Sequence, residues 1–169
     1  MSFYGSAAAF TTYSEARSRT ILAAWTTAVI EAALLISSEW LDDRYDSVWT
    51  GYATDGFTQT RRWPRASAST NTYPQYIFAD TETPDNVDSA VYEAAFRELT
   101  TPGALRADFT SSKYMKVAIS GALAVEYDNS NNSADVQLQI PIIDSLMAPL
   151  LDENSQGSFS SLSGKVSRI

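Results

Sequence analysis

Apolar residues follow a helical period over one long stretch, Thr27 to Tyr45, which we interpret as the centre of a helical core. Acidic residues and a serine fall mostly on the opposite side of this helix. Thr26 or Thr27 can cap its start, and neither glycine nor proline interrupts it. The residues expected in its apolar arc are Val29, Ile30, Ala33, Leu34, Ile36, Trp40, Leu41 and Tyr45.

Three other stretches are expected to form shorter helices: Ala7–Arg19, Asn86–Thr100 and Ile142–Leu151. Pro84 and Asp85 open the second of these, and Glu93 and Arg97 are expected to form an i,i+4 ion pair on its outer side. Pro141 suits the first turn of the last helix, whereas Pro149 should end or kink it.

The stretch Lys113–Asp128 alternates like a β-hairpin around Ser120 and Gly121. A two-residue turn would mix apolar and charged side chains on each face, whereas a three-residue loop, Ser120 to Ala122, keeps the faces separate. The three-residue loop also places Lys116 opposite Glu126 on the second face. Its expected apolar pairs are Ile119 with Leu123, Val117 with Val125, and Met115 with Tyr127.

The remaining segments have no regular period. Residues 46–85 are rich in aromatic, small and polar residues, and we expect them to pack over the core or against a neighbour. Residues 1–6 form a loose or docked arm, and the serine-rich residues 152–169 are expected to be extended or disordered in the isolated chain. The predicted fold is mainly α: a small four-helix core in residues 1–151 with one β-hairpin, a long aromatic-rich loop segment and an extended C-terminal arm, 152–169.

Composition narrows the possible chemistry. The 169 residues include neither cysteine nor histidine, which removes thiol nucleophiles and the commonest general base and metal ligand. The paired acids Asp42-Asp43 and Asp152-Glu153 fit solvated helix positions better than a magnesium site. We therefore expect no catalytic residues, no cofactor and no metal. The chain has no apolar run long enough for a transmembrane helix and no secretory signal, so no membrane association is expected.

A formal net charge of −8 argues against general nucleic-acid binding, which draws on Lys and Arg meeting phosphates. The exception is the basic cluster Arg61-Arg62-Trp63-Pro64-Arg65. Its arginines Arg61, Arg62 and Arg65 are candidate DNA contacts, with the tryptophan stacking on a base. In the competing and favoured interpretation, Trp63 fills the core and the arginines pair with the surplus of acids.

The order of several short motifs resembles a tailed-bacteriophage family often labelled "DnaT-like single-stranded DNA-binding protein", which is structurally similar to head–tail adaptor proteins of the virion neck. The resemblance covers roughly residues 10–151. The motifs that carry it are Tyr13…Glu15-Ala16-Arg17, Glu31-Ala32-Ala33-Leu34-Leu35, Trp40-Leu41-Asp42…Tyr45, Trp49…Gly51, Arg62-Trp63-Pro64-Arg65, the helix led by Pro84, Lys116-Val117…Glu126-Tyr127, and Ile143-Asp144…Met147…Pro149-Leu150-Leu151.

The resemblance implies a non-catalytic virion protein, made in the host cytoplasm, that forms a ring, expected to be a dodecamer, under the portal. Its partners would be copies of itself, the portal protein and a tail, nozzle or tail-terminator protein. Packaged DNA would pass through the ring without specific binding, and an acidic channel suits that passage because like charges repel. Two other functions remain open: a single-stranded DNA-binding replication protein, and a small acidic metal enzyme.

The C-terminal arm carries spaced apolar residues that we predict to be portal-binding anchors. Phe159, Leu162, Val166 and Ile169 stand three, four and three residues apart between serines and glycines. An arm that orders on a partner can cover a wide surface, and a ring multiplies each weak contact. Docking as a helix in a groove and docking as an added strand both fit this spacing.

Overall fold

The computed structural model describes residues 2–106, 116–119, 123–126 and 140–152. The fold is mainly α with two short antiparallel strand pairs, of which one is the predicted hairpin, so the predicted fold class is confirmed. No helix among these residues is both long enough and apolar enough to span a membrane. The four α-helices are α1 (Ala7–Glu15), α2 (Thr27–Tyr45), α3 (Asp85–Thr100) and α4 (Pro141–Met147).

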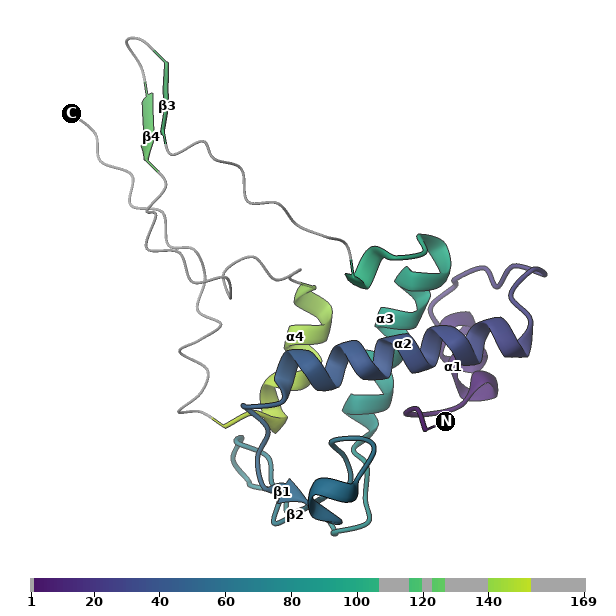
Figure 1. Ribbon diagram of the computed structural model, residues 1–169, viewed down its shortest axis with the longest axis vertical. Coiled ribbons are helices and arrows are strands. Elements are labelled where there is room, and N and C mark those ends of the chain that lie inside the picture. The colour runs from purple at the N-terminus through teal and green to yellow at the C-terminus, as the bar shows by residue number, and fades with distance from the viewer. Residues whose placement is uncertain (1, 107–115, 120–122, 127–139, 153–169) are drawn as a thin grey trace.

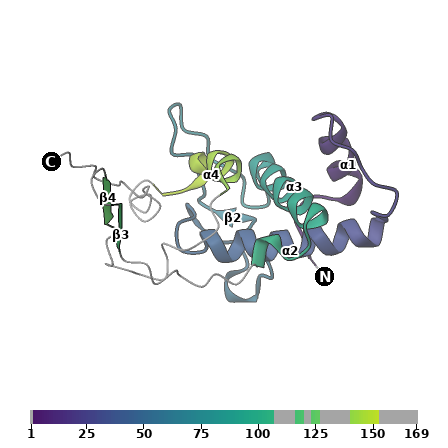
Figure 2. The same cartoon turned by 90° about the horizontal axis from the view of Figure 1, so that it is seen from above.

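The helices form two layers. Helix α2 makes one layer, and α1, α3 and α4 lie together on the same side of it (Figure 1; Figure 2). Helix α3 is the central member of the second layer, since it contacts α1, α2 and α4. A polar contact also ties α4 to the end of α2, because the Asp144 carboxylate accepts hydrogen bonds from Arg44 and Tyr45.

Helix α2 begins and ends where the sequence predicts. The Thr26 hydroxyl accepts a hydrogen bond from the Val29 N–H and so caps its first turn. Most of the predicted apolar arc is buried or partly buried, but Val29 is exposed. The expected polar side is wrong at two positions, since Ser38 and Asp42 are buried.

Helix α1 is shorter than predicted, because it ends at Glu15 instead of Arg19. The N–H groups of Arg17 and Arg19 both donate to the Ser14 carbonyl, and Ser18 has a positive φ of 55°. This turn closes the helix and directs Arg19 back toward α3, which no local sequence signal specifies. The arm before α1 is docked, because the side chain of Tyr4 is buried in the core.

Helices α3 and α4 agree with the expected bounds to within a residue at their starts. Pro84 precedes α3, and Pro141 occupies the first turn of α4. Pro149 ends regular α-helix as predicted, since the chain continues from Met147 as a 3₁₀ turn, Ala148–Leu150. Short 3₁₀ turns also form at Gly56–Thr58 and Ala104–Arg106.

Residues 46–85 pack over the helical core, one of the two outcomes expected for them. Two very short strands, β1 (Tyr52–Ala53) and β2 (Arg65–Ala66), pair antiparallel and hold the segment together. Trp63 is 2% exposed and lies edge-on to the rings of Trp49 and Phe78. The interpretation of Trp63 as a core residue is therefore confirmed.

The predicted hairpin register is also confirmed. Strands β3 (Lys116–Ile119) and β4 (Leu123–Glu126) pair Ile119 with Leu123, Val117 with Val125 and Lys116 with Glu126. This register corresponds to a three-residue connection, which the sequence predicted because it keeps the apolar positions on one face. The further pair expected between Met115 and Tyr127 lies outside the described residues.

Candidate functional site

The basic cluster is the first candidate site, and two of its arginines are held by acids of α2 and its end. Arg61 Nη1 lies 3.2 Å from Asp42 Oδ2, and Arg61 Nε donates to the Ser2 carbonyl at 2.8 Å. Arg62 Nε lies 2.6 Å from Asp46 Oδ1. The Arg61 side chain is only 10% exposed, whereas that of Arg62 is 46% exposed. Arg62 is therefore the member of this pair that solvent reaches most readily.

The third arginine of the cluster serves the backbone. Arg65 is buried, and it donates from Nε to the Thr50 carbonyl at 2.8 Å and from Nη2 to the Gly51 carbonyl at 2.6 Å. These bonds fasten β2 to the turn that precedes β1. The sequence brings Arg61, Arg62 and Arg65 close together, but the structure turns them toward three different sets of partners.

Asp42 lies at the centre of a buried polar network. Its carboxylate accepts a 2.7 Å hydrogen bond from the Tyr4 hydroxyl. That hydroxyl in turn accepts a 3.0 Å hydrogen bond from the backbone N–H of Trp63. The Tyr4 N–H donates to Ser38 Oγ. Burial raises the pKa of Asp42, although Tyr4 and Arg61 act in the opposite direction. The network joins the N-terminal arm, α2 and the basic cluster, so its evident role is structural.

Glu93 is another buried carboxylate, and it pairs with Arg97 of α3 and with Arg17 and Arg19 of the link after α1. Arg19 Nη2 lies 2.8 Å and 2.9 Å from its two oxygens, and Arg97 Nη1 lies 3.1 Å from Oε2. Arg17 Nε lies 3.8 Å from Oε1, and the Tyr13 hydroxyl donates to the same oxygen. The expected outer-side pair of Glu93 with Arg97 is wrong in placement, since the Glu93 side chain is 0% exposed.

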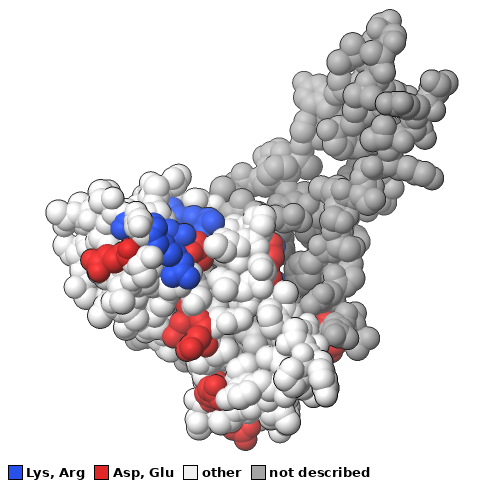
Figure 3. All heavy atoms as spheres, turned by 180° about the vertical axis from the view of Figure 1, so that it is seen from behind, with Lys and Arg blue, Asp and Glu red and all other residues white. Residues whose placement is uncertain are grey.

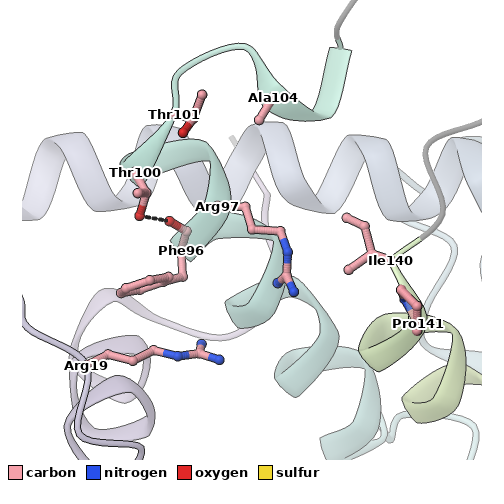
Figure 4. A pocket seen from close by; sticks show the side chains of 8 residues that line it. All are labelled: Arg19, Phe96, Arg97, Thr100, Thr101, Ala104, Ile140 and Pro141. Carbon is pink, nitrogen blue, oxygen red and sulfur yellow. Dashed lines mark hydrogen bonds between the residues drawn. The ribbon is translucent and has the colours of Figure 1, made fainter.

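A pocket of about 610 Å³ opens beside this cluster, where the last turn of α3 faces the start of α4. Figure 4 shows the guanidinium groups of Arg19 and Arg97 pointing toward the same space, with Phe96 and Ile140 on either side. The residues that line the pocket are Arg19, Phe96, Arg97, Thr100, Thr101, Ala104, Ile140 and Pro141. Sequence reasoning missed this site, because Arg19 and Arg97 are distant in the chain and carry no shared motif.

Exposed apolar side chains gather in the loop segment. Five of the eight large apolar side chains exposed in the described ranges belong to residues 52–77. They are Tyr52, Phe57, Tyr73, Tyr76 and Ile77. Isolated exposed apolar residues are ordinary, whereas contiguous apolar patches mark contact surfaces, so we take this segment as a candidate contact surface. The predicted portal-binding anchors Phe159, Leu162, Val166 and Ile169 lie outside the described residues.

The model of one protein family matches residues 2–169, nearly the whole chain. That family is described as "Putative DnaT-like ssDNA binding protein". The chain belongs to this family. No curated protein and no solved structure matches it.

In this member of the family, arginine supplies the positive side chains of the described helices and of the loop segment. Residues 2–106 and 140–152 contain eight arginines and no lysine. Seven of the eight form an ion pair with an acid, and Arg65 is held by backbone carbonyls. On the face shown in Figure 3, cationic and acidic side chains lie side by side. Most of the positive charge in these residues is therefore neutralised by a neighbouring acidic side chain.

Proposed function

We propose that this chain is a structural virion protein, a head-to-tail adaptor that forms a ring under the portal and extends the DNA channel toward the tail. Its main support is a contrast between two groups of side chains: arginines that are already paired within the chain, and apolar side chains that are exposed. Arg61 and Arg65 are held within the fold and Arg62 pairs with Asp46 at the surface, whereas residues 52–77 present aromatic and aliphatic groups to solvent. Such a surface suits contacts between proteins, where aromatic residues are enriched.

The acidic balance fits the same role. A channel for packaged DNA must let the duplex slide, and a net negative chain repels phosphates instead of holding them. The proposed partners are copies of this chain, the portal protein and a tail or tail-terminator protein.

Imaging the virion neck tests the adaptor role most directly. We expect density for this chain as a ring between the portal and the tail. The purified chain should also join purified portal in large rings visible by electron microscopy. Virions that contain none of this chain would contradict the proposal.

Single-stranded DNA binding is the second candidate function, and the family's description is the observation that favours it. A protein of that kind needs a positive groove with aromatic stacking platforms. Residues 52–77 offer the aromatic groups, but the neighbouring arginines are already engaged. We therefore expect the free chain to bind single strands weakly and only at low salt.

Fluorescence anisotropy with a labelled oligo-dT strand separates the two functions. Arg62→Gln tests the accessible member of the basic cluster, and Arg17→Gln is its matched control, with a side chain 45% exposed against 46% for Arg62. Tight binding at physiological salt that Arg62→Gln abolishes and Arg17→Gln preserves would favour the replication role.

A further inference from the structure

The pocket between α3 and α4 combines a charged side with apolar walls. Arg19 and Arg97 supply the charge, and Phe96, Ile140 and Pro141 supply the apolar surface (Figure 4). Its volume, about 610 Å³, lies in the range of pockets that enclose small ligands, roughly 300–1,000 Å³. The space therefore suits a side chain with parts of its neighbours better than a single ion.

The electrostatics beside the pocket are positive on an otherwise acidic protein. Arg17, Arg19 and Arg97 surround the single carboxylate of Glu93, so two positive charges are left in excess. Glu93 is fully buried, whereas the three arginine side chains are 23–45% exposed. Solvent and any ligand therefore meet the cations and not the acid.

The arginines are also held in place before any ligand arrives. Arg97 Nη1 is fixed by the carbonyl and the carboxylate of Glu93, at 2.7 Å and 3.1 Å. The guanidinium of Arg19 stacks over the Phe96 ring, with its carbon 4.8 Å from the ring centroid. Preorganised cations bind an anion with less loss of conformational entropy than mobile ones.

We propose that this pocket binds an acidic side chain, Asp or Glu, that is flanked by apolar residues in a protein partner. A carboxylate matches the flat fork of a guanidinium, and the flanking residues would cover Phe96 and Ile140. Inorganic phosphate fits less well, since it has no apolar part to cover Phe96, Ile140 and Pro141. The inference goes beyond the adaptor role and does not depend on it.

Titration of the full-length, isotope-labelled chain by NMR tests this assignment. The probe is the blocked tripeptide acetyl-Leu-Glu-Leu-amide, and acetyl-Leu-Gln-Leu-amide is its neutral match. Inorganic phosphate forms a third arm. We expect the Glu peptide to shift the amide signals of Thr100, Thr101 and Ala104 saturably, and the Gln peptide and phosphate to bind about tenfold more weakly because the charge-assisted contact is lost or ill-fitting.

Two variants locate the binding. Arg97→Gln should weaken the Glu peptide about tenfold, because it removes the most exposed cation of the pocket. Arg62→Gln makes the same change of charge at a site paired with Asp46 and should leave the affinity unchanged. If Arg97→Gln disturbs the fold, Ala104→Leu serves instead, since it fills the pocket without altering its charge.

Three results would overturn the assignment. The first is phosphate binding at least as tightly as the Glu peptide, which would make the pocket a phosphate site. The second is equal binding of the Glu and Gln peptides. The third is an absence of saturable shifts with all three probes. Because these measurements use the free chain, they leave the test of the adaptor role in the virion neck independent.

Discussion

Two buried carboxylates show how this acidic chain uses its few cations. Asp42 and Glu93 are both buried, and each is met by arginine and by a tyrosine hydroxyl. An unpaired charge in such a position would be very costly, whereas a paired and hydrogen-bonded one is tolerated. The pairs join segments that lie far apart in the sequence, which helps to fix one arrangement of the arm, the helices and the loop segment.

The Glu93 cluster gives a prediction at this scale. Glu93→Gln keeps the shape of the side chain but leaves three arginines without their shared anion. Because these arginines are 23–45% exposed and water can solvate them, the loss should lower the free energy of unfolding by about 1.5–3 kcal/mol. Chemical denaturation at neutral pH measures this difference. Glu31→Gln, at an exposed position of α2, is the control and should have little effect.

The comparison of the wild type with Glu93→Gln also gives a prediction about how stability depends on pH. Burial alone would raise the pKa of Glu93, but hydrogen bonds from Arg19 and Arg97 hold it below its ordinary value of 4.5. The stabilisation is therefore fully present above pH 4.5 and is lost as the pH falls through the lower pKa of the folded protein. The difference in unfolding free energy between the wild type and Glu93→Gln should shrink in that window. A difference that stays constant down to pH 2.5 would contradict the role assigned to Glu93.

At the scale of elements, α2 carries the core, and its burial pattern can be tested. Leu34 is 0% exposed, so Leu34→Asp places an unpaired charge among apolar side chains and should unfold the domain. Val29→Asp makes a comparable substitution five residues earlier, at a position 42% exposed, and should change stability by only about 0.5 kcal/mol. Far-ultraviolet circular dichroism on heating measures both. A cooperative transition near the wild-type melting temperature in Leu34→Asp would refute the assigned core.

The turn that leads into β1 depends on a glycine. Gly51 has a φ of +68°, and a Cβ atom there would lie 2.4 Å from the Ala66 carbonyl oxygen. Gly56 has a similar φ of +58° but open space around it. We expect Gly56→Ala to cost about 1 kcal/mol from backbone strain and Gly51→Ala to cost clearly more, because β2 must also move. Equal unfolding free energies for the two variants would show that the contact with Ala66 is unimportant.

Secondary-structure elements were predicted correctly where the residues that specify them are close together in the sequence. The apolar period, the capping threonine and the prolines were sufficient for α2, α3 and the start of α4, and the separation of faces was sufficient for the hairpin register. Prediction failed where tertiary contacts decide. Helix α1 ends early at a turn that places Arg19 against Glu93, whose side chain is buried. The arginine-lined pocket could not be predicted for the same reason.

For the molecule as a whole, the distribution of charge separates two kinds of surface. The described helical part matches most of its arginines with acids, and residues 52–77 expose apolar side chains. In the part of the chain that the structure describes, the pocket beside Glu93 is one place where positive charge remains in excess and meets a concave surface. These features together favour contacts with proteins, in line with the proposed place in the virion neck.

The C-terminal arm supplies the last prediction, which concerns assembly. Its spaced apolar residues Phe159, Leu162, Val166 and Ile169 are the proposed portal anchors. The buried core of the described residues ends with Leu150 and Leu151, before the arm begins. We therefore expect a chain that lacks residues 157–169 to stay soluble, with a melting temperature close to that of the full chain, but to be absent from virions.

A full-length variant serves as the control for the truncation, because it separates the loss of the apolar anchors from the loss of chain length. Replacing the four anchors with serine keeps the arm and its charges but removes the apolar surface that a partner would bury, and each anchor lost should weaken binding by about 1.5–3 kcal/mol. A ring multiplies this loss over its subunits, so assembly should fail sharply. The measurement is the amount of this chain in purified virions from cells that supply each version. Normal incorporation of either the truncated or the serine version would show that portal binding resides elsewhere, with the exposed aromatic side chains of residues 52–77 as the next surface to test.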